Sequence, residues 1–153
     1  MISTLQKVLI GIGAMVVLGC LVVGLLLGSA VYGWKAALRA GNEAATLQDI
    51  KTVAAVEIQY YNTHNRTFGT FDQLIKEDML TSRFSGERTS TDGYVFTLNV
   101  TPKTAVQASS YTLNSDPQNA NTGTNHFYID SRSAEIHTNP NQPASATDPL
   151  YDK

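Results

Sequence analysis

The hydrophobic pattern is dominated by a long apolar run near the start of the chain. From Val8 to Trp34 no charged residue occurs over 27 positions, whereas about 20 apolar residues let a helix cross the hydrocarbon core of a membrane. At its end Tyr32 and Trp34 precede Lys35, and aromatic rings followed by a cation are typical of the membrane interface. The pattern predicts a single membrane-spanning anchor within residues 1–40.

The same run contains a helix-packing spacing and several candidate processing sites. Gly24 and Gly28 form a G-x-x-x-G pair, which lets two membrane helices approach closely. A lipoprotein-type site would give a mature chain beginning at Cys20, and a secretory signal would be cut after Ala30. Prepilin-type processing would remove a shorter leader, and an uncleaved span would keep the whole run. Basic residues flank both ends of the run, so charge alone does not set the orientation.

Residues 35–62 show the period of an amphipathic helix. They contain no proline and only one glycine, Gly41, so the membrane helix is predicted to continue through them as one element of about 50 residues. Their apolar side chains cover an arc of about 200°, roughly twice the stripe that a single core needs. The surplus predicts a further partner for this helix. The predicted packing face consists of Leu47, Ile50, Val53, Ala54, Ile58 and Tyr61.

Two acidic residues lie within or beside this apolar arc. Glu57 falls inside it, where an unpaired charge is costly to bury. One interpretation is a salt bridge from Glu57 to a cation of a neighbouring subunit. A second is that Glu57 lies at the edge of the packed zone and reaches water. The same two interpretations apply to Asp49, at the opposite margin of the arc.

The remaining sequence predicts a short helix followed by an antiparallel sheet. Thr70 to Gln73 match a capping box, which predicts a helix that ends near Leu80. Alternation of apolar and polar residues then predicts strands joined by short turns, with Ser131 to Ser133 turning the last pair. The strands are expected within residues 93–100, 109–115, 126–130 and 134–138.

The C-terminal residues differ in composition from this domain. Residues 139–153 contain three of the five prolines and little apolar content, which predicts a flexible tail. The expected organisation is an anchor over residues 1–40, a globular domain over residues 41–138 that includes the second half of the long helix, and the tail. The fold class is α+β, with a helix that is half transmembrane and half amphipathic packed on a three- to four-stranded antiparallel sheet.

The charge distribution argues against one class of partner. The chain has a net charge of −2, but residues 41–153 carry 8 basic and 13 acidic residues. A domain of net charge −5 lacks the basic surface that binds phosphates, so nucleic acid is not expected as a partner. The single cysteine, Cys20, has no second cysteine for a disulfide or a thiolate metal site.

No catalytic or metal-binding pattern stands out. His64, His126 and His137 are scattered without metal-ligand spacing, although His126 and His137 flank a predicted hairpin. No serine or threonine lies in a nucleophile-elbow pattern. We therefore expect no enzyme activity, no cofactor, no metal and no small-molecule substrate.

The order of these elements resembles the type IV pilins and the major pseudopilins of type II secretion. The resemblance is closest along "ALRAGNEAATLQDIKTVAAVEIQYYNTHNRTFGTFDQLIKEDML", residues 37–80, where "NEA" precedes a helix with a tyrosine pair and a loop leading to a "GT" helix start. The segments "GYVFTLNV" and "TGTNHFYIDSRSAEIHTN" are similar to the strand and final hairpin of short bacterial pilins.

The resemblance implies a non-enzymatic, single-pass subunit of a cell-envelope filament or secretion apparatus. In that family the first half of the helix anchors the subunit in the bacterial inner membrane and later packs in the filament centre, while the second half lies on the sheet. The C-terminal domain would lie in the periplasm, or outside the cell once assembled. The implied partners are the membrane and other pilin-like subunits or further copies of this chain.

One departure from the family pattern qualifies these expectations. Prepilins carry a glycine cleavage site and a glutamate at the fifth position after it, but cutting after Gly11 or Gly13 would place Val16 or Leu18 there. The missing glutamate favours an uncleaved pilin-like protein or an atypical minor subunit. The alternative function is a membrane-tethered periplasmic module that binds a ligand or protein and does not polymerise.

Overall fold

A computed structural model describes the backbone of residues 4–86 and 89–152 and the side chains of residues 33–86 and 89–152. It divides into two compact units, Met1–Ala37 and Leu38–Lys153, which are described separately. The helices are α1 (Thr4–Thr63), α2 (Phe71–Lys76) and the short 3-10 helix η1 (Ser82–Phe84). The strands are β1 (Thr89–Thr91), β2 (Tyr94–Thr101), β3 (Ser110–Pro117), β4 (His126–Asp130) and β5 (His137–Asn139).

Helix α1 is continuous over the residues whose side chains are described. From residue 33 to Thr63 it has no break, as the proline-free sequence predicted. It ends where Asn65 and Arg66 adopt positive φ angles of 51° and 57°, which an α-helix cannot continue. The predicted transmembrane half lies, apart from its last residues, outside the described side chains.

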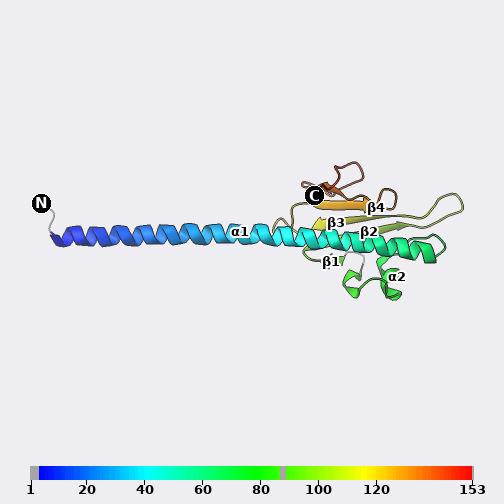
Figure 1. Cartoon of the computed structure of the whole chain (residues 1–153), viewed down its shortest axis with the longest axis horizontal. Coiled ribbons are helices and arrows are strands. Elements are labelled where there is room, and N and C mark those ends of the chain that lie inside the picture. Colours follow the sequence, from blue (N-terminus) through cyan, green and yellow to red (C-terminus); the bar gives the residue numbers. More distant parts are fainter. Residues whose placement is uncertain (1–3, 87–88, 153) are drawn as a thin grey trace. The chain divides into compact units, whose positions relative to one another are not determined.

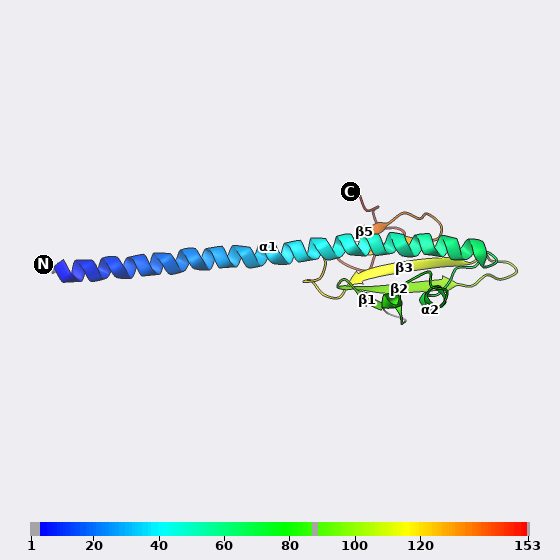
Figure 2. The same cartoon turned by 60° about the horizontal axis from the view of Figure 1, so that its bottom comes forward.

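The strands form one antiparallel sheet in the order β1-β2-β3-β4-β5, so each strand pairs with its neighbours in sequence. Figure 1 labels β1 to β4, and Figure 2 labels β5. The longest pairing joins β2 to β3 from Tyr94↔Pro117 to Thr101↔Ser110. Tyr94 and Phe96 are fully buried, as the alternation in this strand predicted. The antiparallel sheet is therefore confirmed, but the expected three or four strands are five in the part of the chain described here.

The additional strand, β1, lies in a segment for which the sequence pattern predicted no strand. Its three residues, Thr-Ser-Thr, show no apolar alternation. It pairs with β2 across Asp92 and Gly93, whose φ angles are +50° and +77°. Positive φ at both central residues is what a two-residue type I′ hairpin requires, and an Asp-Gly pair is its usual sequence. That dipeptide was the available signal for β1.

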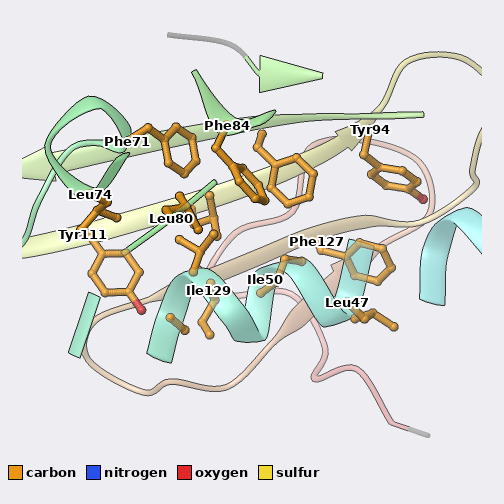
Figure 3. Packing of buried hydrophobic residues seen from close by; sticks show 14 of the residues in the cluster. Leu47, Ile50, Phe71, Leu74, Leu80, Phe84, Tyr94, Tyr111, Phe127 and Ile129 are labelled. Atoms are coloured by element: carbon orange, nitrogen blue, oxygen red, sulfur yellow. The ribbon is translucent and has the colours of Figure 1, made fainter. Parts of the chain in front are cut away.

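The domain core lies between α1 and the sheet. In Figures 1 and 2 the C-terminal part of α1 runs along β2 and β3. Figure 3 shows Leu47 and Ile50 of α1 among aromatic side chains of the strands and the 3-10 helix. Phe84 packs edge-on against Phe96 at 5.5 Å between ring centroids. Burial of these rings is the main driving force for folding.

Helix α2 has the capping box that the sequence predicted. The Thr70 hydroxyl accepts a hydrogen bond from the Gln73 backbone N–H at 3.4 Å, and the Thr70 N–H donates to the Gln73 side chain at 2.8 Å. The helix ends at Lys76 and not near Leu80, because Asp78 turns the chain with a φ of 56°. Leu80 nevertheless reaches the core.

The C-terminal segment is not the loose tail that its composition predicted. The Tyr151 N–H donates to the Ile136 carbonyl at 2.7 Å, and Leu150 forms a β-bridge with His137. The Tyr151 ring packs edge-on against Phe127 at 5.7 Å, and Ala144 is buried. Residues 139–152 therefore belong to the globular domain, because a few apolar side chains and backbone bonds fasten a largely polar segment.

Candidate functional site

The predicted packing face of α1 divides into a buried part and an exposed part. Leu47, Ile50, Val53 and Ala54 are buried in the domain core. Ile58 is 53 % exposed and lies outside this core. Tyr61, also in the predicted face, is half-buried and stacks on Phe68 at 4.6 Å between ring centroids. The apolar arc is thus only partly covered by the chain's own domain.

The acids of α1 do not contribute to its uncovered surface. Glu43, Asp49 and Glu57 are engaged with other parts of the domain. The exposed residues of the helix instead include the apolar Leu38 and Ile58, the basic Lys51 and the polar Gln48, Thr52 and Gln59. The uncovered surface of α1 therefore carries no acid among these residues, whereas the domain as a whole is acidic.

A groove borders the exposed end of the packing face. We call it the Phe68 groove, and its volume is about 600 Å³. It lies between the C-terminal end of α1, the segment before β3 and the turn after β4. Its lining is mainly apolar on the helix side and polar on the strand side: Ile58, Tyr61, Asn62, Phe68, Gln107, Ala108, Ser109, Ser110, Ser131 and Arg132. Such a surface is suited to contact with another molecule.

A smaller groove of about 330 Å³ lies farther toward the start of the same helix. It is formed where Tyr151 of the C-terminal segment approaches α1. The helix contributes Ala40, Glu43, Ala44, Leu47, Gln48 and Lys51. Both grooves therefore have one wall made by α1, the element to which the sequence assigned an additional partner.

Glu57 is completely buried within the domain, which corrects both interpretations drawn from the sequence. Its side chain is 0 % exposed, so it neither reaches water nor is available to a neighbouring subunit's cation. One carboxyl oxygen accepts a hydrogen bond from the Gly69 N–H at 2.9 Å. Burial disfavours the charged form and raises the pKa of Glu57 to about 7, although the Gly69 N–H lowers it.

Asp49 is also buried, at 4 % exposure, and does not reach water. Arg83 of η1 forms an ion pair with it, and the same guanidinium lies 3.5 Å from Asp92. Burial raises the pKa of Asp49 and outweighs the opposing effect of Arg83. Asp49 thus joins α1 to the segment that leads into β1.

Glu43 fastens the loop between β3 and β4 to α1. One of its carboxyl oxygens accepts the Thr124 N–H at 2.7 Å and the Asn125 N–H at 3.2 Å. The other accepts the Asn125 side-chain amide at 2.9 Å. The neighbouring Asn42 side chain donates to the Thr122 carbonyl at 2.8 Å. Hydrogen bonds to a carboxylate are stronger than those between neutral groups. We call these contacts of Glu43 and Asn42 the Glu43 clamp, and they hold the loop that leads into β4.

We expect Glu43→Ala to destabilise the domain by about 1–3 kcal/mol, because it leaves these donors without their acceptor. Chemical denaturation of the full chain measures the change. The control is Glu135→Ala, at an exposed position, where the expected change is within about 0.5 kcal/mol. Equal effects of the two substitutions would show that the clamp contributes nothing to stability.

The histidines have local structural partners. His64 stacks on Tyr60 at 3.8 Å and pairs with Glu77 at 2.8 Å. His126 pairs with Asp116 at 2.6 Å, and the His137 ring bonds the Asp148 carbonyl at 2.7 Å. Across residues 33–86 and 89–152, no group of three or more His, Cys, Asp or Glu side chains is placed to hold a metal.

The predicted anchor residues are mostly beyond what the structure describes. Val8, Gly24, Gly28 and Tyr32 lie outside the described side chains, and Trp34 is 73 % exposed. A search confined to the described residues found no helix with the length and apolar character that crossing a membrane requires.

Sequence reasoning missed three residues that organise this region. No pattern singled out Glu43 on the helix, Arg83 lies between the predicted short helix and the predicted strands, and Tyr151 belonged to the predicted tail. Each acts through a contact distant in sequence, such as the 81 positions between Glu43 and Thr124. The "NEA" segment, already noted within the family resemblance, was the one available signal for Glu43.

Comparison with known proteins gave no match among family models, curated proteins or solved structures.

Proposed function

We propose that this chain is a non-enzymatic, pilin-like or pseudopilin-like subunit, anchored by its N-terminal apolar run in a bacterial inner membrane. Its C-terminal domain would lie in the periplasm, or outside the cell if subunits assemble. The proposal includes the long helix with a transmembrane half and an amphipathic half. Its expected partners are other pilin-like subunits or further copies of the chain.

The observation that carries the proposal is that only some of the apolar residues of α1 are buried by the chain's own sheet. One side of the helix covers a five-stranded antiparallel sheet through Ile50, Val53 and their neighbours. Ile58 and Leu38, about 160° apart around the helix, stay exposed on either side of this covered strip. A subunit that packs against neighbours through this helix needs apolar side chains beyond those that cover its own sheet.

Charge supports an association between copies. The exposed side of α1 carries Lys51, whereas residues 41–153 have a net charge of −5. An exposed cation on the helix and a net negative charge on the domain are compatible with a contact between different surfaces of two copies. Such a heterologous contact generates rings or open filaments.

Cross-linking in intact cells tests the proposal. In a Cys20→Ser background, cysteine is introduced at the exposed α1 positions Thr52 and Ile58, and a short bifunctional maleimide is added to spheroplasts or intact cells. We expect covalent dimers and larger products of this chain or of other pilin-like subunits, because the exposed side of α1 would face a neighbour. Denaturing electrophoresis and mass spectrometry identify the products.

Ser145→Cys is the matched control, since Ser145 is exposed on the C-terminal segment and is not part of α1. It should give far less product. Recovery of monomer alone from both α1 positions, with full labelling by a monofunctional maleimide, would overturn the proposal. Intact mass of the membrane-bound chain adds the processing state. A start at Met1 supports the uncleaved form, and a start at Ile12 or Ala14 supports prepilin-type cleavage.

The Phe68 groove favours a second candidate function, a membrane-tethered periplasmic module that binds a ligand or protein without polymerising. Its volume of about 600 Å³ and its mixture of aromatic, serine and arginine side chains are compatible with a bound molecule. The two functions differ in the cross-linking experiment, because the binding module should give no ladder of self-products from Thr52.

A further inference from the structure

The buried carboxyl of Glu57 has an incomplete set of hydrogen bonds. Oε2 accepts the Gly69 N–H at 2.9 Å, and the side chain is 0 % exposed. Oε1 is buried, and no residue in the described part of the chain donates a hydrogen bond to it. A buried acceptor without a donor is unfavourable, and more so when the carboxyl is charged. The closed position of Glu57 is therefore sensitive to whether the carboxyl carries a proton.

The groups around Glu57 offer little to offset a negative charge. Tyr111 of β3 is 2 % exposed, and burial together with Glu57 and Asp130 raises its pKa to about 12. Tyr60 lies on α1, and burial, Glu77 and Glu57 raise its pKa. Both phenols therefore stay neutral. His64 stacks on Tyr60 but directs its Nε2 toward Glu77.

The segment Thr67–Thr70 is what Glu57 holds against α1. Gly69 packs so closely that a Cβ there would lie 2.9 Å from Leu74 and 3.2 Å from the Tyr60 ring. The adjacent Phe68 stacks on Tyr61 at 4.6 Å and meets the Tyr111 ring edge-on at 5.0 Å. Its N–H donates to the Ser109 hydroxyl at 3.1 Å. Phe68 contributes this segment's part of the wall of the Phe68 groove.

We propose that Glu57 is a proton-controlled latch on this wall: the protonated carboxyl holds the segment Thr67–Thr70 closed, and loss of the proton favours an open form of the groove. In the open form the carboxylate reaches water, which removes the cost of burying its charge. The latch goes beyond the proposed function and does not depend on it.

The sign of the pH dependence follows from linkage. The pKa of Glu57 is raised from its ordinary value of 4.5 to about 7 in the closed form, mainly by burial. Opening therefore releases a proton between these two pH values. The opening equilibrium constant should rise by up to about tenfold for each pH unit in this window and level off above pH 7.

Amide hydrogen exchange tests the latch in the full chain. The Gly69 and Phe68 amides are followed between pH 5 and pH 8 under conditions in which exchange reports the opening equilibrium, with correction for the intrinsic rate. In the natural chain the opening constant should rise by about 40-fold from pH 5 to pH 7. In Glu57→Gln, whose side chain keeps an acceptor for the Gly69 N–H and has no charge, it should not depend on pH.

Two controls separate the latch from general destabilisation. Glu77→Gln removes a carboxylate from the same region and should preserve the pH dependence. The Leu113 amide, in the middle of β3, reports unfolding of the whole domain. Unfolding of the whole domain also hydrates Glu57 and shares its pH dependence, so the latch is recognised by opening constants at Phe68 and Gly69 that exceed the one at Leu113 at each pH. The proposal is overturned if Phe68 and Gly69 show no pH dependence, if Glu57→Gln retains it, or if their opening constants equal that of Leu113.

Discussion

Ile50→Ala is expected to lower the free energy of unfolding by about 2–5 kcal/mol, because it opens a cavity where α1 meets the sheet. Ile50 is 0 % exposed and faces the aromatic residues of the core (Figure 3). Urea unfolding of the full chain in a mild detergent, followed by near-ultraviolet circular dichroism of the tyrosines, measures the loss. If the alanine variant does not fold, Ile50→Val should still cost about 0.5–1.5 kcal/mol.

The matched control is Ile58→Ala, the same change eight positions farther along the same helix. Ile58 is 53 % exposed, so its truncation should change stability by less than about 1 kcal/mol. Comparable losses at positions 50 and 58 would contradict the assignment of the two sides of α1. In cells, Ile58→Ala is instead expected to weaken the contacts that the cross-linking experiment detects.

Gly123→Ala is expected to destabilise the domain by about 2–4 kcal/mol, since overpacking and a lost hydrogen bond act together. A Cβ at this position would clash with the Tyr94 hydroxyl group. Tyr94 is fully buried, and its hydroxyl donates to the Asn125 carbonyl at 2.8 Å. The ring would have to move away from the loop that Glu43 also holds. The loss is measured by the same unfolding experiment.

Gly41→Ala provides the opposite expectation for the same chemical change. No described atom lies within 4 Å of the Cβ position at Gly41, and glycine inside a helix is less favourable than alanine by about 1 kcal/mol. This substitution should therefore leave stability unchanged or raise it by up to about 1 kcal/mol. If both alanine variants were neutral, the close packing of Tyr94 on Gly123 would be wrong.

The elements that were predicted correctly have one side buried in the core. In such elements apolar and polar residues alternate with the period of a helix or a strand. The α1 segment and strands β2 to β4 have such periods, because one side of each meets the core. Strand β1 lacks one, since it is short and lies at the edge of the sheet. Residues 139–152 were misjudged for a related reason: their burial depends on isolated residues such as Ala144 and Tyr151.

The candidate site was only partly accessible to sequence reasoning. The broad apolar arc included both the buried residues and the exposed Ile58. The period of the sequence does not show which of these residues the domain's own sheet buries and which it leaves exposed. The environment of Glu57 depends on the Gly69 N–H, 12 positions away, and on the loop that brings it there. An acid within an apolar arc has the same pattern whether it is hydrated or enclosed.

The contacts of Glu43 and Tyr151 affect the rate at which the domain folds. Glu43 bonds to Thr124 and Asn125, and Tyr151 closes the groove beside Leu47. Contacts between the first helix and such late residues give the domain a high contact order, which slows folding. Ile50 and Val53 are synthesised long before the strands that cover them. During synthesis this part of the helix therefore remains uncovered for roughly 60–80 residues of elongation, which takes several seconds at about 5–20 residues per second. Chaperone protection matters most in this interval.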